Sequence, residues 1–320
     1  MTLPSSAIRQ QRAIIDRKEA AERLEHAVSQ CAPADRRQVA LGMLQQMLEQ
    51  GRNEISRRLR EHPSQGHRSA QEQSFLIDQI IRLAYDFVTE TLYPTANRST
   101  SEKIAVLAVG GYGRGEMAPF SDVDIGFITP YKRTAWTEQV VETVLYLLWD
   151  LGLKVGQSSR SLDETVRMAE EDLTIRTALL ESRFIWGDRE VFDEASRRFW
   201  NDVASKTGSD FVARKMAERD DRHKRMGDSR YVVEPNIKEG KGGLRDLHTL
   251  YWIGKYVYRV RSVADLVDVG LLTADEFRKF RKAEEFLWTV RCHMHDIAGR
   301  AEDRLTFDLQ RDVAQRMQFA

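Results

Sequence analysis

The stretch "AVGGYGRGEMAPFSDVDIGF" (residues 108–127) places a cluster of glycines just before two aspartates. Asp122 and Asp124 lie two positions apart where a strand is expected to begin, so their side chains should point to the same face. Two carboxylates on one face can hold Mg²⁺ beside the phosphate oxygens of a substrate. Glycines let a backbone approach a polyphosphate closely, with N–H groups directed at the anion. The stretch therefore predicts a two-metal site for transfer of a nucleotidyl group, with Asp122 and Asp124 as the metal ligands and catalytic carboxylates.

The glycine turn before the aspartates is the predicted phosphate-binding segment. Its first glycine pair should admit the phosphates, and the following glycines and arginine should extend the turn and add a positive charge. The predicted nucleotide-binding residues are Gly110, Gly111, Gly113, Arg114, Gly115 and Ser121.

Two common nucleotide-binding motifs are excluded by spacing. A dinucleotide-binding G-x-G-x-x-G turn would need a third glycine at Glu116 and a helix directly after it, whereas we expect a loop and then a strand. No G-x-x-x-x-G-K-[ST] loop occurs in the sequence. A mere tight corner with solvated aspartates is the remaining alternative, and the joint pattern of strand, glycines, Ser-Asp-x-Asp and strand favours function over it.

A second stretch with candidate binding residues is "IKEGKGGLRDLH" (residues 237–248). In one interpretation Lys238, Lys241 and Arg245 face the triphosphate or a protein substrate. In the other, the glycines form a helix entry and Asp246 stabilises the helix start through its dipole. The sequence leaves both open.

The surrounding sequence predicts one short sheet among many helices. Branched apolar runs closed by glycine are typical of buried strands, and apolar residues repeated every three or four positions are typical of helices. The expected strands are 103–110, 123–128 and 153–159, with short strands also possible at 230–237 and just after residue 181. The expected helices are two within 1–60 that break near "CAPADR", one at 73–92, one at 134–151, and most of the chain after 161.

These elements predict an α/β (α+β) nucleotidyltransferase domain at 71–188, a helical leader at 1–70 and a mainly helical domain at 189–320. The stretch "EHPSQGHRSAQEQ" (61–73) reads as a polar linker between the first two. The last residues still show a helical pattern at Ala320 without a stop signal, so we expect a truncated final domain.

Composition excludes several classes of partner. Lysine plus arginine and aspartate plus glutamate both count 49, so no net field attracts nucleic acid or anionic lipid. The two cysteines, Cys31 and Cys292, are far apart and without metal-ligand spacing. No signal peptide or membrane-spanning run is visible. We expect a cytoplasmic protein that binds neither nucleic acid nor membrane.

With these motifs in view, the sequence resembles the polymerase-β-like nucleotidyltransferases, in the form found in the bifunctional PII uridylyltransferase/uridylyl-removing enzymes. The resemblance covers roughly residues 70–320, and the leader matches only as a helical segment. Stretches in the same order as in that family are "LLWDLGLKVGQSSRSLDE" (147–164), "DLTIRTALLESRFIWGD" (172–188), "YVVEPNIKEGKGGLRDLHTLYW" (231–252) and "EDRLTFDLQRDVAQRM" (302–317).

The resemblance implies transfer of UMP from UTP to a tyrosine of the signalling protein PII, with Mg²⁺ as cofactor and release of pyrophosphate. It places UMP removal and glutamine sensing in further domains, so we expect the removing activity to be absent from this chain. Two alternatives stay open: a protein adenylyltransferase related to the glutamine synthetase adenylyltransferases, and a catalytically silent nucleotide-binding module. No residue selects uracil over adenine.

The resemblance also implies a third carboxylate that takes the proton of the attacking hydroxyl. The strand expected to carry it, "LKVGQSS", has none. Glu181 is the nearest candidate and Asp150 is another, although an acid beside Arg183 is also typical of a structural ion pair. His293 and His295 diverge by about 200° on a helix, so we expect them to be structural rather than metal ligands.

Overall fold

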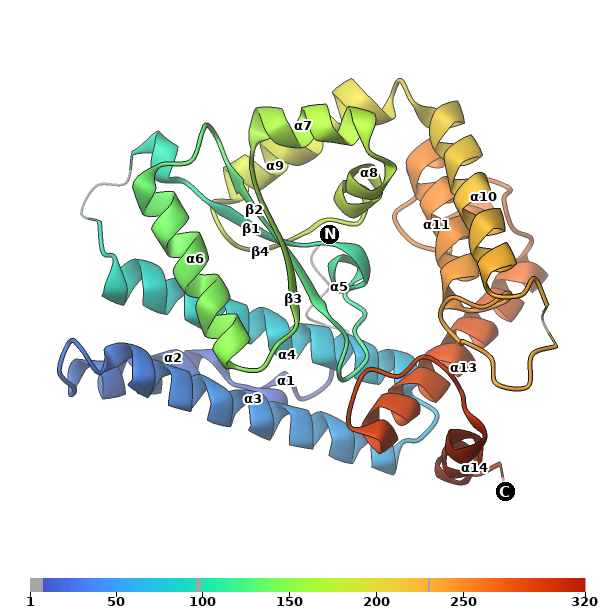
Figure 1. Cartoon of the computed structure of the whole chain (residues 1–320), viewed down its shortest axis with the longest axis horizontal. Coiled ribbons are helices and arrows are strands. Elements are labelled where there is room, and N and C mark those ends of the chain that lie inside the picture. The colour runs from blue at the N-terminus through green and yellow to red at the C-terminus, as the bar shows by residue number, and fades with distance from the viewer. Residues whose placement is uncertain (1–7, 96–98, 230, 320) are drawn as a thin grey trace.

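A four-stranded mixed sheet lies among the helices of this computed structural model, which describes residues 8–95, 99–229 and 231–319 (Figure 1). The strand order is β3-β2-β1-β4; β1 is antiparallel to β2 and β4, and β2 is parallel to β3. The strands are β1 (Ala105–Ala108), β2 (Val123–Thr129), β3 (Val155–Ser161) and β4 (Arg183–Gly187). The strands expected at 103–110, 123–128, 153–159 and after residue 181 are therefore confirmed.

Helices cover both faces of the sheet. Alternate residues such as Val106 and Phe127 pack on α4 (Gly66–Asp86) and α6 (Ala135–Asp150), while Leu107 and its neighbours face α9 (Arg189–Arg198) and the start of α7 (Leu162–Glu171). Both faces of the central strands β1 and β2 are thereby removed from water, which explains why these two strands read as near-continuous apolar runs. The helix expected at 134–151 is confirmed as α6.

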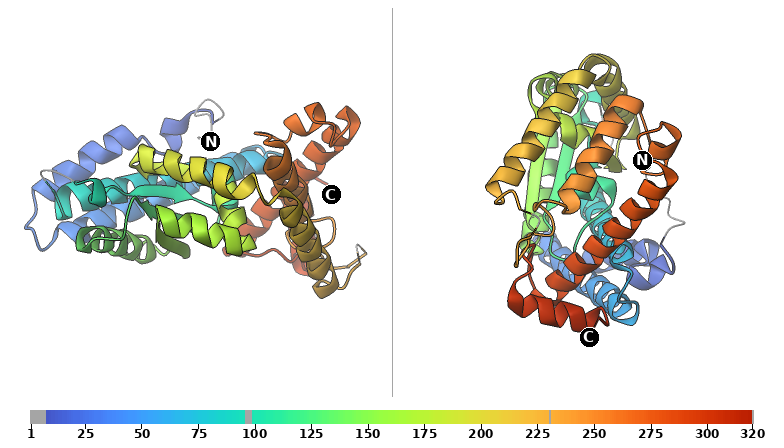
Figure 2. Two further views of the ribbon diagram at one scale, coloured as in Figure 1. Left: turned by 90° about the horizontal axis from the view of Figure 1, so that it is seen from above. Right: turned by 90° about the vertical axis from the view of Figure 1, so that its right-hand side faces the viewer.

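Most of the remaining helices come before β1 or after β3 in the chain. Before the sheet come α1 (Gln11–Ile14), α2 (Arg17–Ser29), α3 (Arg36–Glu61), η2 (Phe87–Leu92) and η3 (Thr100–Glu102). Of these, α1, α2, α3 and η2 contribute to the same buried cluster as α4 and α6. After β3 come α8 (Leu173–Leu180), η4 (Phe199–Ala204), α10 (Gly208–Arg225), α11 (Leu244–Tyr258), α12 (Asp265–Asp268), α13 (Ala274–Ala298) and α14 (Phe307–Arg316). Figure 2 shows the helices from α10 onward gathered at one end of the molecule. Within the described ranges, no helix is both long enough and apolar enough to cross a bilayer.

The polar linker expected at 61–73 is wrong, because most of it forms the first turns of α4. Gly66 packs directly on α13: a Cβ at this position would lie 2.1 Å from the Cα of Thr289, and the Gly66 N–H donates to the Thr289 hydroxyl at 3.1 Å. Polar residues of this segment are buried in ion pairs, such as Glu72 with Arg58. The boundary expected at 70/71 thus falls inside a helix. The break near "CAPADR" is confirmed between α2 and α3.

Two other expected elements differ. Residues 231–237 form no strand, and Asn236 makes one isolated bridge to Arg304. The side-chain oxygen of Asn236 accepts from the Lys238 and Glu239 N–H groups, which closes a turn directly after the bridge. Position 230 lies outside the described residues. The helix expected to reach Ala320 ends at Arg316, and Ala320 is also outside the described part.

A buried ion pair fastens α4 to the sheet. Asp78 accepts from Arg183 at 2.6 and 3.0 Å and from the Tyr112 hydroxyl at 2.7 Å. The side chains of Asp78 and Arg183 are only 6% and 3% exposed. Removing one partner would leave an uncompensated charge without water.

We therefore expect Asp78→Asn to lower the free energy of unfolding by about 3–5 kcal/mol. Urea unfolding followed by circular dichroism measures the change. The control is Asp193→Asn, which removes an exposed ion pair with Arg189 and should cost less than about 1 kcal/mol. Equal effects of the two variants would contradict the importance of the buried pair.

Candidate active site

A cavity of about 250 Å³ opens where β2 begins, between the sheet and the helices α11 and α13. It joins the glycine turn and the Ser-Asp-x-Asp motif to residues more than a hundred positions later. Among the residues that line it are Gly110, Gly111, Ser121, Asp122, Asp124, Lys238, Arg245, Arg291 and Asp303. The structure therefore brings together the two aspartates, the first glycine pair, Ser121, and the basic residues Lys238 and Arg245.

The two aspartates share this cavity as their spacing predicts. Asp124 lies in β2 and Asp122 precedes its first residue. Glycines make room for the Asp124 carboxylate: a Cβ on Gly156 of the neighbouring strand would lie 2.5 Å from Oδ1, and one on Gly110 would lie 3.3 Å from Oδ2. Burial, together with the charge of Asp122, raises the pKa of Asp124 above its usual value. A bound cation would relieve this repulsion.

Three cationic side chains face the aspartates from the later part of the chain. Lys238 and Arg245 approach from the turn before α11 and from its first turn, and both oppose the rise in the pKa of Asp124. Arg291 of α13 donates to the Ser121 hydroxyl at 3.4 Å and to Asp303 at 2.7 Å. Burial and the charge of Arg291 lower the pKa of Lys238. The cavity thus holds carboxylates on one side and cations on the other, as a site for metal-bound phosphates requires.

The glycine turn is more regular than expected. Residues Gly110–Arg114 form the short helix α5, which begins after β1 and ends at Gly115 in the left-handed region, with φ 80°. Gly113 faces away from the aspartates: a Cβ there would lie 2.2 Å from the Glu181 carbonyl oxygen and 3.0 Å from that of Ala108. The structure therefore places Gly110 and Gly111 in the cavity, whereas Gly113 and Gly115 shape the helix and its contact with β4.

Arg114 lies at the wall of the cavity inside a buried cluster of charges. Its guanidinium donates to Glu116 at 2.8 Å, to Glu181 at 2.6 Å and to Nδ1 of His248 at 3.3 Å. Burial alone would raise the pKa of Glu116, but Arg114 and His67 hold it well below its usual range. Burial and Arg114 lower the pKa of His248, so its ring is neutral. The charge of Arg114 is compensated within the protein.

Three other candidates lie elsewhere. Glu181 is 3% exposed and lines a neighbouring cavity beyond Arg114, not the one with the aspartates. Lys241 pairs with Asp228 at 2.7 Å. Asp150 pairs with Arg37 at the end of α6. None of the three faces Asp124 in this arrangement.

The carboxylate that the sequence analysis missed in this cavity is Asp303. It pairs with Arg291 and lies 3.4 Å from Nε2 of His295. Burial alone would raise the pKa of Asp303, but His295 and Arg291 hold it below its usual value. It belongs to "EDRLTFDLQRDVAQRM", a stretch quoted above without any role for its acids. His295 is thus a neighbour of the cavity, while His293 bonds to the Pro63 carbonyl oxygen.

The side chains of the cavity fit a Mg²⁺ ion that is held partly by the protein and partly by its substrate. Across the described ranges, no group of three or more histidine, cysteine, aspartate or glutamate side chains could hold a metal by itself. Asp122 and Asp124 supply two carboxylates, and the adjacent cationic wall leaves room for an anionic substrate. Mg²⁺ in phosphate sites is typically bound by one or two carboxylates plus substrate oxygens.

The negative charge of Asp122 is one of the causes that raise the pKa of Asp124. We expect Asp122→Asn to lower the pKa of Asp124, because one of the two causes that raise it is removed while Lys238 and Arg245 still lower it. Carbon-13 NMR of the carboxyl groups measures the change. The exposed Asp163→Asn serves as control; an unchanged Asp124 titration in Asp122→Asn would show that the two carboxylates do not interact.

Comparison with known proteins agrees with this architecture. The sequence pattern of the family described as "Nucleotidyltransferase domain" matches residues 93–185, and that of "GlnD PII-uridylyltransferase" matches residues 210–320. The first range contains β1, β2, β3 and the start of β4, together with the glycine turn and both aspartates. The polymerase-β-like α/β fold with additional helical regions is thereby confirmed.

Relatives match nearly the whole chain. A "Bifunctional uridylyltransferase/uridylyl-removing enzyme" of Novosphingobium aromaticivorans is 62% identical over 98% of this chain and 34% of its own length. Its counterparts in Erythrobacter litoralis and Rhodospirillum rubrum are 61% and 55% identical over 97% and 99% of this chain, again 34% of their length. The similarity extends into residues 1–70, where only helical character was expected. Over nearly its whole length the chain is therefore similar to bifunctional uridylyltransferase/uridylyl-removing enzymes, and it spans about a third of the length of the relatives it matches.

Proposed function

We propose that the cavity at the start of β2 transfers UMP from UTP to a tyrosine hydroxyl of the PII protein and releases pyrophosphate. The observation that carries the proposal is the meeting, in one cavity, of two carboxylates, a glycine pair and three cations drawn from distant parts of the chain. The printed names of the relatives support uridylyl transfer in particular. Those relatives are about three times as long as this chain.

The triphosphate would lie between the glycine turn and the cationic wall. Gly110 and Gly111 present backbone without side chains, and Lys238, Arg245 and Arg291 supply positive charge opposite. Arg114 takes another role in this arrangement: since it is enclosed by Glu116 and Glu181, it fixes α5 rather than binding phosphate. Charges held in place before the substrate arrives lose no energy to reorganisation during the reaction.

Asp122 and Asp124 would hold Mg²⁺, which when bound supplies stabilisation of the charge that develops on the phosphoryl oxygens. The chain's own residues orient the substrate for an in-line displacement. The tyrosine oxygen forms a bond to the α-phosphorus, the bond from that phosphorus to the bridging oxygen breaks, pyrophosphate departs, and the hydroxyl proton is released to water.

The test is incubation of the protein with purified PII, Mg²⁺ and either UTP, ATP, CTP or GTP, followed by intact mass analysis of PII. A mass increase of one uridylyl group with UTP alone is the expected result. Modification with ATP instead would favour protein adenylylation, and no modification with any nucleotide would favour a silent nucleotide-binding module.

One substitution distinguishes a catalytic role of the Asp124 carboxylate from a structural role. We expect Asp124→Asn to reduce transfer by at least about a hundredfold, because removing one group that stabilises transition-state charge typically costs that much. Its melting temperature should not fall, since the Asp124 carboxylate makes no ion pair with any described residue. The matched control is Asp163→Asn, whose carboxylate is 88% exposed. Near-native transfer by a folded Asp124→Asn variant would contradict the assignment.

A further inference from the structure

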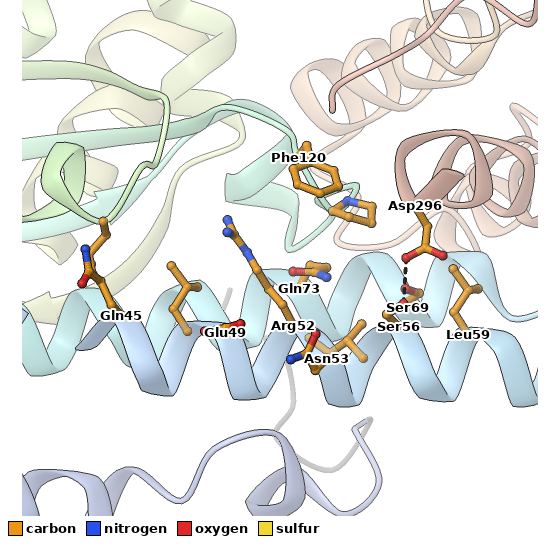
Figure 3. Close-up of a pocket in the computed structure, with 14 residues that line it drawn as sticks. Gln45, Glu49, Arg52, Asn53, Ser56, Leu59, Ser69, Gln73, Phe120 and Asp296 are labelled. Atoms are coloured by element: carbon orange, nitrogen blue, oxygen red, sulfur yellow. Dashed lines mark hydrogen bonds between the residues drawn. The ribbon is translucent and has the colours of Figure 1, made fainter. Parts of the chain in front are cut away.

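A second cavity, of about 390 Å³, lies behind the segment that leads into the catalytic aspartates (Figure 3). Its floor is formed by α3 and α4, and its cover by Pro119 and Phe120, the residues just before Ser121. Apolar side chains from α3 and the end of α6, including Leu48, Ile55 and Leu151, line much of it. It shares no lining residue with the cavity that contains Asp122 and Asp124.

Arg52 of α3 is a cation without a carboxylate. Figure 3 shows its guanidinium rising from α3 into the cavity toward Phe120, whose ring centroid lies 6.0 Å away. Within the described parts of the chain no aspartate or glutamate oxygen lies within ion-pair distance of it, and its Nε is buried without a hydrogen-bond partner. Other buried arginines differ in this respect: Arg58 pairs with Glu72, and Arg183 with Asp78. Burial lowers the pKa of Arg52 with no opposing acid.

Gln73 of α4 is a second unpartnered group in the same cavity. The residue is only 4% exposed, and its carboxamide makes no hydrogen bond with any residue that the structure describes. Figure 3 shows Gln73 among the side chains that line the cavity, as Arg52 does. The buried Nε of Arg52 without a partner costs free energy, and the Gln73 amide opens into the same cavity, where a ligand or ordered water can partner both.

We propose that this cavity is a binding site for a small organic monocarboxylate. The planar guanidinium of Arg52 matches the two oxygens of a carboxylate, and the Gln73 amide can donate to one of them. The apolar residues would cover the carbon skeleton, as in ligand pockets of this size.

The charge of the cavity favours one negative charge over two. Arg52 is the single cation among its lining residues, and Glu49 also lines it. Asp296 is engaged with Ser56 at 2.7 Å and with Arg316. A doubly charged anion such as phosphate would meet the Glu49 carboxylate with only one guanidinium to compensate.

The occupant would touch the segment that positions the catalytic aspartates. Phe120 is followed directly by Ser121 and Asp122, and its N–H donates to Nδ1 of His295 at 3.4 Å. His295 in turn contacts Asp303 of the catalytic cavity. A ligand that engages Arg52 therefore changes the contacts of Phe120 and, through the backbone, those of Asp122.

Binding is tested without nucleotide or PII, so the result does not depend on the proposed function. The probe is 3-fluorobenzoate, followed by fluorine NMR as the protein is titrated, with 3-fluorobenzamide as the uncharged counterpart. We expect saturable binding of the benzoate that Arg52→Gln weakens by about tenfold or more, equivalent to at least about 1.4 kcal/mol. Amide signals of Ser121 and Asp122 should shift when the probe binds.

The matched control is Arg57→Gln on the same helix, whose exposed guanidinium pairs with Glu54 and Glu61 and which should leave binding unchanged. Gln73→Leu gives a second, independent loss and carries the test if Arg52→Gln fails to fold. Binding that survives both Arg52→Gln and Gln73→Leu would overturn the proposal. Equal binding of the benzamide, or displacement of the probe by inorganic phosphate at lower concentration than by benzoate, would overturn the carboxylate class.

Discussion

The enclosure of the Arg114 guanidinium by Glu116, Glu181 and His248 is the interaction on which the catalytic cavity depends. These groups come from the turn after α5, the end of α8 and the first half of α11. A charge in such a place is tolerated only when it is paired and hydrogen-bonded, so all these segments must be in position together. The short helix that presents Gly110 and Gly111 to the cavity is held through this cluster, and so is the wall that carries Arg245.

The same cluster divides two cavities. On one side lie the aspartates and the cations that face them; on the other lies a more apolar cavity that contains Glu181 and Lys255. Gly113 helps to separate the two cavities, because only a residue without a side chain lets α5 contact the Glu181 backbone. The glycine motif thus serves two purposes: its first half leaves the cavity open beside the aspartates, and its second half leaves space for protein.

Local patterns in the sequence predicted the parts of the fold that depend on local rules. The strands were visible as branched apolar runs, α6 as a helical repeat, and the aspartate pair through its period of two. Long-range packing was not visible. Residues 61–73 are polar by composition, yet Gly66 is buried because α13, more than two hundred positions later, lies on it, and Glu72 is buried against Arg58 of α3. Asp303 and Arg291 were missed for the same reason, since their nearness to Ser121 arises only when α13 and the turn after it return to the sheet.

The crossing of α4 and α13 at Gly66 has a mechanical consequence. With the two backbones this close, and with no room for even one methyl group between them, the crossing acts as a fixed pivot and not as a sliding surface. Arg291 lies on α13 just beyond this pivot, and Lys238 and Asp303 are anchored beside it, so the width of the catalytic cavity is set by a rigid corner of the molecule. The proposed triphosphate would therefore be accommodated by side chains and by the turn at residues 238–243, while the helices that frame the site keep their spacing.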